Sequence, residues 1–309
     1  MDDVLGKRLV IVVGKGGVGK TTVAAALGIA AARAGKRTMV CEVAEQEQIT
    51  QVFGKPAAGF NETEVAENLH TFSINPDDAK QEWVKHQLHS GALAGLLNSS
   101  RIFQYLTAAA PGLAEIVTIG KVWELAQLDR RTPGAAPYDL VILDAPATGH
   151  GLALMRAPRT YAEVAKVGPI HNHAKQIERF ITDPASTAIV AVALPEEMPV
   201  NETVDLEDRL RDELGMDLSR VFLNGVLAER FSSKDAEAIA SVDGAGSAGA
   251  RAALGAALAA HERTRSQRSQ VRRLKRGVDA PVATLPFILT PELGPEDLET
   301  LSREVERKV

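Results

Sequence analysis

Short, continuous apolar runs alternate with longer amphipathic segments along the chain. The first run, Leu9–Val13, contains no polar residue, and a glycine-rich segment separates it from the alanine-rich stretch Thr22–Arg33. Such a run is typical of a strand buried on both faces, and the stretch after it is typical of a helix. Strands that alternate with helices predict an α/β fold with a doubly wound, mostly parallel sheet. Further strands are predicted at Arg37–Val43, Leu69–Ile74, Tyr138–Asp144, Ser186–Leu194, Ser219–Gly225 and Pro281–Pro286.

The segment from Pro76 to about Arg131 is long and contains no predicted strand. It begins with the helix-start signal Asn75-Pro-Asp-Asp78, and its helical pattern is interrupted at Gly91 and at Pro111-Gly112. We interpret it as a helical subdomain inserted into a single domain that spans residues 1–309. Its apolar side chains either pack against the α/β core or form an exposed groove for an apolar ligand.

Two other connections are predicted to be irregular. Residues 44–50 are polar and lead into a turn at Gln51–Gly54. Residues 241–249 are almost all small, which predicts a mobile loop.

The glycine-rich segment between the first strand and the first helix indicates phosphate binding. Its residues fit G-x-x-x-x-G-K-[ST], a motif that requires this strand–loop–helix context. Glycines let backbone N–H groups surround phosphate oxygens, and the helix N-terminus adds its dipole. Lys20 is predicted to reach the β- and γ-phosphates, and the Thr21 hydroxyl to hold Mg²⁺, so the motif predicts binding of a nucleoside triphosphate with Mg²⁺. The residues predicted to bind the nucleotide here are Gly14, Lys15, Gly16, Gly17, Val18, Gly19, Lys20, Thr21 and Thr22.

Lys15 is a second lysine within the same motif. One lysine is enough for the phosphates of its own loop, so Lys15 is free to reach a phosphate bound by a neighbouring subunit, as an arginine finger does. The nonapeptide Gly14–Thr22 resembles the deviant Walker A motif of the ArsA/Get3/MinD/ParA group of dimerising P-loop ATPases. This resemblance implies that Lys15 acts catalytically across a nucleotide-sandwich dimer.

Asp144 ends a predicted parallel strand, at the sheet edge where ligands of open α/β folds bind. We predict that it holds Mg²⁺, directly or through a water molecule. The heptapeptide Asp144-Ala-Pro-Ala-Thr-Gly-His150 resembles switch II of the ArsA/Get3 branch. The resemblance implies that the Gly149 N–H senses the γ-phosphate and that His150 relays the signal to the helical region. A capping or packing role for His150 remains the alternative.

Two later segments are predicted to contact the base of the nucleotide. Asn224 ends a predicted strand with an amide that can bind the adenine edge. The resemblance places the adenine-contacting asparagine at this position and implies that Pro286 and Phe287 lie in the loop that covers the base. A turn-forming role is the alternative for Asn224.

The chain departs from the ArsA/Get3 pattern at switch I. The pattern has Ser-Thr-Asp-Pro-Ala-His, whose aspartate positions the attacking water, whereas this chain has Cys41-Glu-Val-Ala-Glu-Gln-Glu-Gln48. Either Glu42 or Glu45 could orient a water molecule, and Glu42 is our candidate catalytic residue. Slow or partner-dependent hydrolysis is the expected consequence.

Composition narrows the possible functions. The net charge of −5 argues against a chain built mainly to coat nucleic acid, and no apolar run approaches the ~18–20 residues of a membrane helix. The N-terminus does not resemble a signal peptide, so we expect a cytoplasmic protein without a transmembrane segment. With Cys41 as the single cysteine, the metalloid-binding cysteines of ArsA and the zinc-binding CxxC pair of eukaryotic Get3 are absent. Activation by arsenite or antimonite is therefore not expected.

These features together resemble the single-domain, cysteine-poor ArsA-like ATPases of actinobacteria. They predict a Mg-ATP-dependent dimerising ATPase that converts ATP and water to ADP and phosphate. Opening and closing of the helical subdomain would act on a protein client or membrane partner. The alternatives are a ParA/MinD-like positioning ATPase and a nucleotide-binding subunit of a heterodimer with a paralogue. The basic stretch 262–276 is interpreted as a solvated helix, so no stable nucleic-acid binding is expected.

Overall fold

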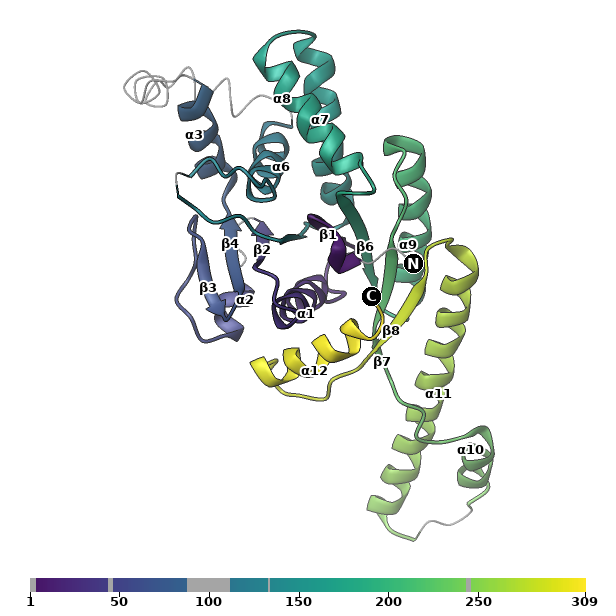
Figure 1. The fold of residues 1–309 in the computed structure, drawn as a ribbon. Coiled ribbons are helices and arrows are strands. Elements are labelled where there is room, and N and C mark those ends of the chain that lie inside the picture. The colour runs from purple at the N-terminus through teal and green to yellow at the C-terminus, as the bar shows by residue number, and fades with distance from the viewer. Residues whose placement is uncertain (1–3, 44–46, 88–111, 133, 243–245) are drawn as a thin grey trace.

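The computed structural model describes residues 4–43, 47–87, 112–132, 134–242 and 246–309. These residues form an eight-stranded sheet in the order β3-β4-β2-β5-β1-β6-β7-β8 (Figure 1). β3 runs antiparallel to β4, and all the other neighbouring pairs are parallel. The predicted doubly wound, mostly parallel α/β fold is therefore confirmed. The strands are β1 (Leu9–Val13), β2 (Thr38–Val43), β3 (Thr63–Ala66), β4 (Leu69–Ile74), β5 (Leu140–Asp144), β6 (Thr187–Ala193), β7 (Arg220–Val226) and β8 (Val282–Pro286).

Helices cover both faces of the sheet, which explains the unbroken apolar runs. In β1, Leu9, Ile11 and Val13 belong to one buried cluster, whereas Val10 and Val12 belong to the other. Successive side chains of a strand point to opposite faces, so a strand covered on both sides needs apolar residues at every position. The helices packed on the first cluster include α6 (Leu113–Leu125), α7 (Thr148–Ala165), α8 (Pro169–Thr182) and α9 (Glu197–Arg209), and those on the second include α1 (Lys20–Arg33) and α12 (Pro295–Glu306).

The long segment without strands contains two described helices, α3 (Pro76–Gln87) and α6. An ion pair of 2.9 Å between Lys121 Nζ and Glu82 Oε1 joins them, and Val117, Ile119 and Val122 of α6 are buried in the first cluster. The described part of this segment thus packs against the α/β core. Residues 88–111, which include the predicted interruptions at Gly91 and Pro111, lie outside the described residues. The inserted subdomain stays a prediction.

Three local details differ from the sequence prediction. β3 was not predicted, because Thr63–Ala66 is short and half polar and becomes a strand only through pairing with β4. Residues 48–52 form the helix α2 (Gln48–Val52) rather than an irregular connection. The helix α11 begins at Ala248, within the stretch predicted to be a loop, where the Ser247 side chain accepts a hydrogen bond from the Ala250 N–H and caps it.

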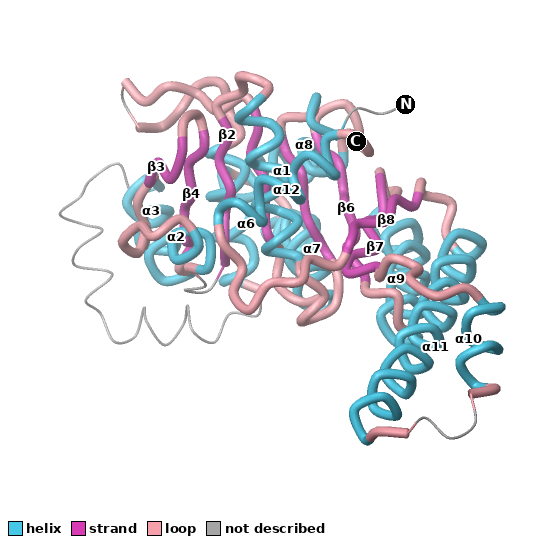
Figure 2. Tube along the Cα trace, turned by 90° about the horizontal axis from the view of Figure 1, so that it is seen from below, coloured by secondary structure: helices cyan, strands magenta, loops and turns pink. Residues whose placement is uncertain are grey.

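A helical arm extends from the sheet region. It consists of α10 (Ser233–Ala240) and α11 (Ala248–Gly277), which lie side by side, and the N-terminal half of α11 projects beyond the layers (Figures 1 and 2). The C-terminal end of α11 returns to the body, where Leu274 is buried.

The remaining C-terminal helix, α12, is bound to the body by its apolar face. Leu298, Leu301 and Val305 are buried in the second cluster beside α1. They are therefore not available for insertion into a bilayer, as a MinD-like membrane-binding helix would require. Among the described helices, none has both the length and the apolar composition needed to cross a membrane. Two short turns complete the described elements, a 3₁₀ turn at Val4–Gly6 and a π-helical turn at Leu210–Leu214.

Candidate nucleotide-binding site

The loop between β1 and α1 has a conformation that favours glycine at three positions. Gly14, Gly17 and Gly19 have φ values of 146°, 80° and 89°, in the left-handed region. A Cβ atom at Gly14 would collide with the Val192 carbonyl oxygen, and one at Gly19 would collide with the Asn224 amide nitrogen. The loop is therefore packed tightly against β6 and β7, and its exposed residues Gly16 and Gly17 face solvent.

Thr21 and Asp144 meet at the start of α1. β5 is paired with β1 in parallel, so Asp144 lies beside the end of β1 and close to the loop that follows it. Thr21 Oγ1 donates a hydrogen bond of 2.5 Å to Asp144 Oδ2. Burial raises the pKa of Asp144 to about 6, against the opposing effects of this hydrogen bond and of the charge on Lys20. The sequence placed these residues 123 positions apart, and the fold brings them into contact.

The donor set fits a magnesium ion. Asp144 Oδ1 is buried and has no hydrogen-bond partner among the described residues. A hydroxyl and a carboxylate are hard oxygen ligands of the kind that Mg²⁺ prefers, and Mg²⁺ at such sites takes few protein ligands and completes its shell with water and phosphate oxygens. Thr21 and Asp144 would hold the ion.

A hollow of about 410 Å³ opens in front of this pair. Seven of the predicted residues line it, namely Gly16, Gly17, Gly19, Lys20, Thr21, Thr22 and Asp144. Lys20 Nζ donates a hydrogen bond of 3.2 Å to the Lys15 carbonyl oxygen, so the ammonium group lies under the loop. Burial lowers the pKa of Lys20, and the Asp144 charge opposes that effect. The hollow thus has the cation, glycine loop and helix N-terminus of a phosphate site.

A second hollow, of about 220 Å³, adjoins the first at Gly19 and Thr22. It is lined by Asn224, Pro286 and Phe287, the residues predicted to contact the base, and by Val18. Asn224 Nδ2 donates a hydrogen bond of 3.1 Å to the Val18 carbonyl oxygen, which leaves its amide oxygen available for another donor. The predicted base-binding residues therefore lie next to the phosphate loop.

Lys15 does not line either hollow. Its Nζ atom lies 2.5 Å from Glu202 Oε1 of α9, and about a third of each side chain is exposed. The lysine is therefore held at the surface by an acidic partner from its own chain.

Glu42 has both carboxylate oxygens engaged by the backbone of α2. It accepts hydrogen bonds from the N–H groups of Gln48 and Ile49, at 2.9 and 3.4 Å, and is buried. Burial raises the pKa of Glu42 to about 7, and these two backbone hydrogen bonds oppose the shift. Glu42 thus fixes the first turn of α2, while the exposed Gln48 side chain lines the phosphate hollow. Glu45, the other carboxylate considered for this role, lies outside the described residues.

The raised pKa of Glu42 makes folding pH-dependent. The carboxyl group is protonated more readily in the folded chain than in the unfolded chain, so its contribution to stability is present below about pH 4.5 and is lost as the pH rises through about 7. Glu42→Gln cannot titrate. We expect the free energy of unfolding of the wild type to fall by about 2–3 kcal/mol relative to Glu42→Gln between pH 5 and pH 8.

Urea unfolding at several pH values, without nucleotide or Mg²⁺, measures this difference. Glu67→Gln replaces an exposed carboxylate on the β3–β4 turn and should parallel the wild type. A constant difference between wild type and Glu42→Gln across the pH range would show that Glu42 titrates normally.

Gly149 and His150 lie in the first turn of α7 and are exposed. α7 starts directly after residues 144–147, which line the phosphate hollow, and the Thr148 N–H donates a hydrogen bond of 3.1 Å to the Gly14 carbonyl oxygen. The N–H groups in a first helical turn have no partner within the helix. Gly149 is thus close to the hollow without lining it, and its sensing role stays a prediction.

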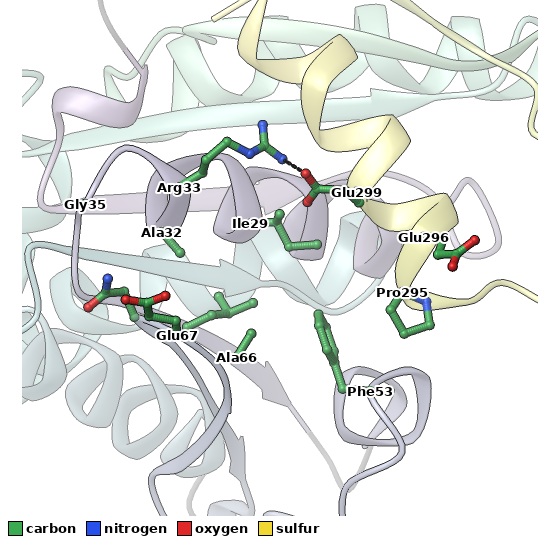
Figure 3. A pocket seen from close by; sticks show the side chains of 12 residues that line it. Ile29, Ala32, Arg33, Gly35, Phe53, Ala66, Glu67, Pro295, Glu296 and Glu299 are labelled. Atoms are coloured by element: carbon green, nitrogen blue, oxygen red, sulfur yellow. Dashed lines mark ion pairs between the residues drawn. The ribbon is translucent and has the colours of Figure 1, made fainter.

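A wider hollow of about 780 Å³ lies at the opposite end of α1, away from the glycine loop. Figure 3 shows Ile29, Ala66 and Phe53 on its floor, and Arg33 reaching to Glu299 of α12 with an ion pair of 2.7 Å. It contains none of the predicted site residues. Within the described parts of the chain, no group of three or more histidine, cysteine, aspartate or glutamate side chains could hold a metal.

Comparison with protein families agrees with this geometry. Residues 7–173 and 162–243 match the model of the anion-transporting ATPases, ArsA, and together they cover well over half of the chain. The chain belongs to the ArsA ATPase family. The family predicted from the nonapeptide and from switch II is thereby confirmed.

Three relatives illustrate the range of the ArsA family. The chain is 28% identical over 236 residues to ATPase BagA of Mycobacterium tuberculosis, covering 74% of this chain and 68% of the relative. It is 28% identical over 208 residues to a putative arsenical pump-driving ATPase of Chlorobaculum tepidum, covering 67% and 48%. It is 25% identical over 264 residues to ATPase GET3C of Arabidopsis thaliana, covering 70% and 66%. The mycobacterial similarity agrees with the predicted resemblance to actinobacterial ArsA-like ATPases.

Sequence reasoning missed two residues at this ArsA-family site. Gln48 ends the departing switch I segment, and its polar side chain was the only sequence signal that it could face the nucleotide. Glu202 lies 187 positions from its partner Lys15, in a segment that carries no predicted site residue. Its position one helical turn into α9, beside the loop after β1, became apparent only from the structure.

Proposed function

We propose that this ArsA-family chain is a Mg-ATP-dependent ATPase that acts as a dimer. The observation that carries the proposal is the convergence of Lys20, Thr21 and Asp144 on one hollow, with the base-binding residues beside it. Lys20 offsets the charge of the β- and γ-phosphates, and the glycine loop donates N–H groups to them. Asn224 orients the base, and Phe287 covers it. When bound, Mg²⁺ neutralises charge on the β- and γ-phosphates.

Gln48 is our candidate for positioning the attacking water. Its carboxamide can both donate and accept hydrogen bonds, which is the property that a water-orienting residue of a P-loop hydrolase needs. Glu42 then acts as a positioning residue, because it fixes the start of α2 through two backbone hydrogen bonds. Glu42 is not proposed to act on the water directly, because both of its carboxylate oxygens already accept backbone hydrogen bonds.

The dimer is proposed from Lys15. Lys20 occupies the position of the phosphate-binding lysine, and Lys15 is directed to Glu202 at the surface. An ion pair between partly exposed groups contributes little to stability, on the order of 0–1 kcal/mol. Lys15 can therefore leave Glu202 for a phosphate across an interface. The partner is a second copy of the chain or an ArsA-like paralogue.

Coupling to a client is proposed through α7. The segment that lines the phosphate hollow leads directly into α7, which packs against α6 of the long helical segment. A change in the position of Gly149 on binding or loss of the γ-phosphate would thus be transmitted to α6. A protein client or membrane partner at the helical subdomain would respond to this change in α6. We propose that the protein acts in the cytoplasm.

Light scattering of the purified chain tests the dimer. We expect a monomer with Mg-ADP and a dimer with Mg²⁺ and a non-hydrolysable ATP analogue, because only a γ-phosphate offers Lys15 a partner across the interface. The same mass in both states would overturn the proposed sandwich. If the larger species forms only after a paralogous subunit is added, a heterodimer would replace the proposed homodimer.

A further inference from the structure

An apolar hollow of about 800 Å³ lies between the middle of α11 and the segments that follow β7 and β8. Ala256, Ala259 and Ala260 of α11 line one side of it, and Phe287 and Leu289 line the other. Phe287 and Leu289 are 53% and 83% exposed, which is unusual for large apolar side chains and is typical of a binding surface. The volume is within the usual range for small-molecule sites, about 300–1,000 Å³.

Two arginines line the same hollow without an acidic partner. Neither Arg230 nor Arg263 forms a hydrogen bond or an ion pair with the described part of the chain, and no acidic residue is among the described residues of the lining. Other arginines of α11 are neutralised, for example Arg268, whose guanidinium pairs with Glu229. The hollow therefore combines an apolar floor with two uncompensated positive charges.

Two polar side chains at the hollow already have hydrogen-bond partners. The Thr264 hydroxyl donates a hydrogen bond of 2.9 Å to the Ala260 carbonyl oxygen. The Gln267 amide joins α11 to the end of β7, since its oxygen accepts from the Leu227 N–H at 2.9 Å and its nitrogen donates to the Gly225 carbonyl oxygen at 3.2 Å. The walls are thus held together, and the described side chains of the lining offer a ligand apolar surface and guanidinium groups.

We propose that this hollow is a binding site for an anionic amphiphile, a free long-chain carboxylate. The methylene chain lies over Ala256, Ala259 and Leu289, and the carboxylate pairs with Arg230 and Arg263. Guanidinium groups bind carboxylates with two parallel hydrogen bonds, and these are stronger than hydrogen bonds between neutral groups. A nucleotide or a polar peptide fits less well, because the lining has no free side-chain amide or hydroxyl to bind it. Phe287 also lines the base pocket, so the site abuts the nucleotide without including its phosphates.

Calorimetric titration of the full chain with dodecanoate, below its micelle concentration, tests this site. We expect saturable binding of one dodecanoate per chain. Decanoate, which is two methylenes shorter, should bind about tenfold more weakly, because each buried methylene contributes a nearly constant share of the affinity. Dodecyltrimethylammonium has the same chain and the opposite charge, and it should bind at least about tenfold more weakly than dodecanoate.

Variants locate the ligand. Arg230→Ala and Arg263→Ala should each lower the affinity for dodecanoate by about tenfold or more. Arg272→Ala removes an exposed arginine of the same helix outside the hollow, and it should bind like the wild type. Ala259→Phe narrows the apolar part of the hollow but keeps both arginines, and it should also weaken binding. Circular dichroism and thermal melting verify that each variant is folded.

Three results would overturn the proposal. The first is no binding of dodecanoate by the wild type, which would leave the hollow to a different occupant, such as an acidic helix of a protein partner. The second is equal binding of the anionic and cationic probes. The third is binding that Arg230→Ala and Arg263→Ala leave unchanged. None of these readouts depends on ATP turnover, so they are independent of the proposed ATPase activity.

Discussion

Lys15→Ala is expected to reduce ATP turnover by about 10³-fold or more while ATP still binds with nearly wild-type affinity. The reason is that the two lysines occupy different positions at the site. Lys20 lies under the loop and lines the phosphate hollow, whereas Lys15 lies outside the hollow beside Glu202. Loss of a positive charge that is supplied across an interface typically costs this much in phosphoryl transfer. Steady-state phosphate release and equilibrium ATP binding measure the two effects separately.

Glu202→Gln is the matched control for Lys15. It keeps the lysine and removes the negative charge that holds it within its own chain. Turnover should persist, and the nucleotide-dependent dimer should form at a lower protein concentration than in the wild type. If Lys15→Ala weakened ATP binding as strongly as turnover, Lys15 would serve the phosphates of its own loop and the sandwich arrangement would be wrong.

Asp144→Asn is expected to lower Mg²⁺-dependent ATP turnover by about 10²–10³-fold and, at the same time, to stabilise the ligand-free protein at alkaline pH. Asparagine has the same shape but no charge to offer a metal ion. Asp144 is buried, and burial raises its pKa to about 6, so its contribution to stability is lost as the pH rises from about 4 through 6. The substitution removes that titration, and the stability of the variant relative to the wild type should therefore increase with pH up to about 7.

These opposite effects separate loss of the site from loss of the fold. Thermal melting at pH 5 and pH 8 without Mg²⁺ or nucleotide measures the stability of the variant, and phosphate release at pH 8 measures its turnover. A variant that loses turnover and also loses stability at pH 8 would show that Asp144 is needed for the fold, and the metal-binding role would lose its support.

The sequence predicted most of the fold because the decisive signals were local. Runs such as Leu9–Val13 and residues 140–143 are apolar at every position, so they specify buried parallel strands without knowledge of their neighbours. β3 and α2 lack such signals. β3 depends on its pairing with β4, and the first turn of α2 depends on Glu42, which lies outside the helix.

Most of the candidate site could also be predicted from the sequence, because its main signals are local motifs. The glycine loop and Asp144 are recognisable from motifs, and Asn224 and Phe287 were reached by resemblance and lie beside the loop in the structure. Gln48 was not predicted. The Lys15–Glu202 pair was not predicted either, because a contact between residues 187 positions apart is fixed by packing of α9 against the sheet rather than by any local pattern. The arginine-lined hollow on α11 also depends on three segments that only the fold brings together.

ATP turnover per chain, measured with Mg²⁺ over a wide range of protein concentrations, tests the central claim most directly. If the active species is a dimer with Lys15 supplied by the second subunit, turnover per chain should be low in dilute protein, rise with concentration and reach a plateau. Turnover that does not depend on concentration would show that a monomer is sufficient. Tight ATP binding without turnover at any concentration would also contradict a self-sufficient homodimer, and it would direct attention to a paralogous subunit or a client.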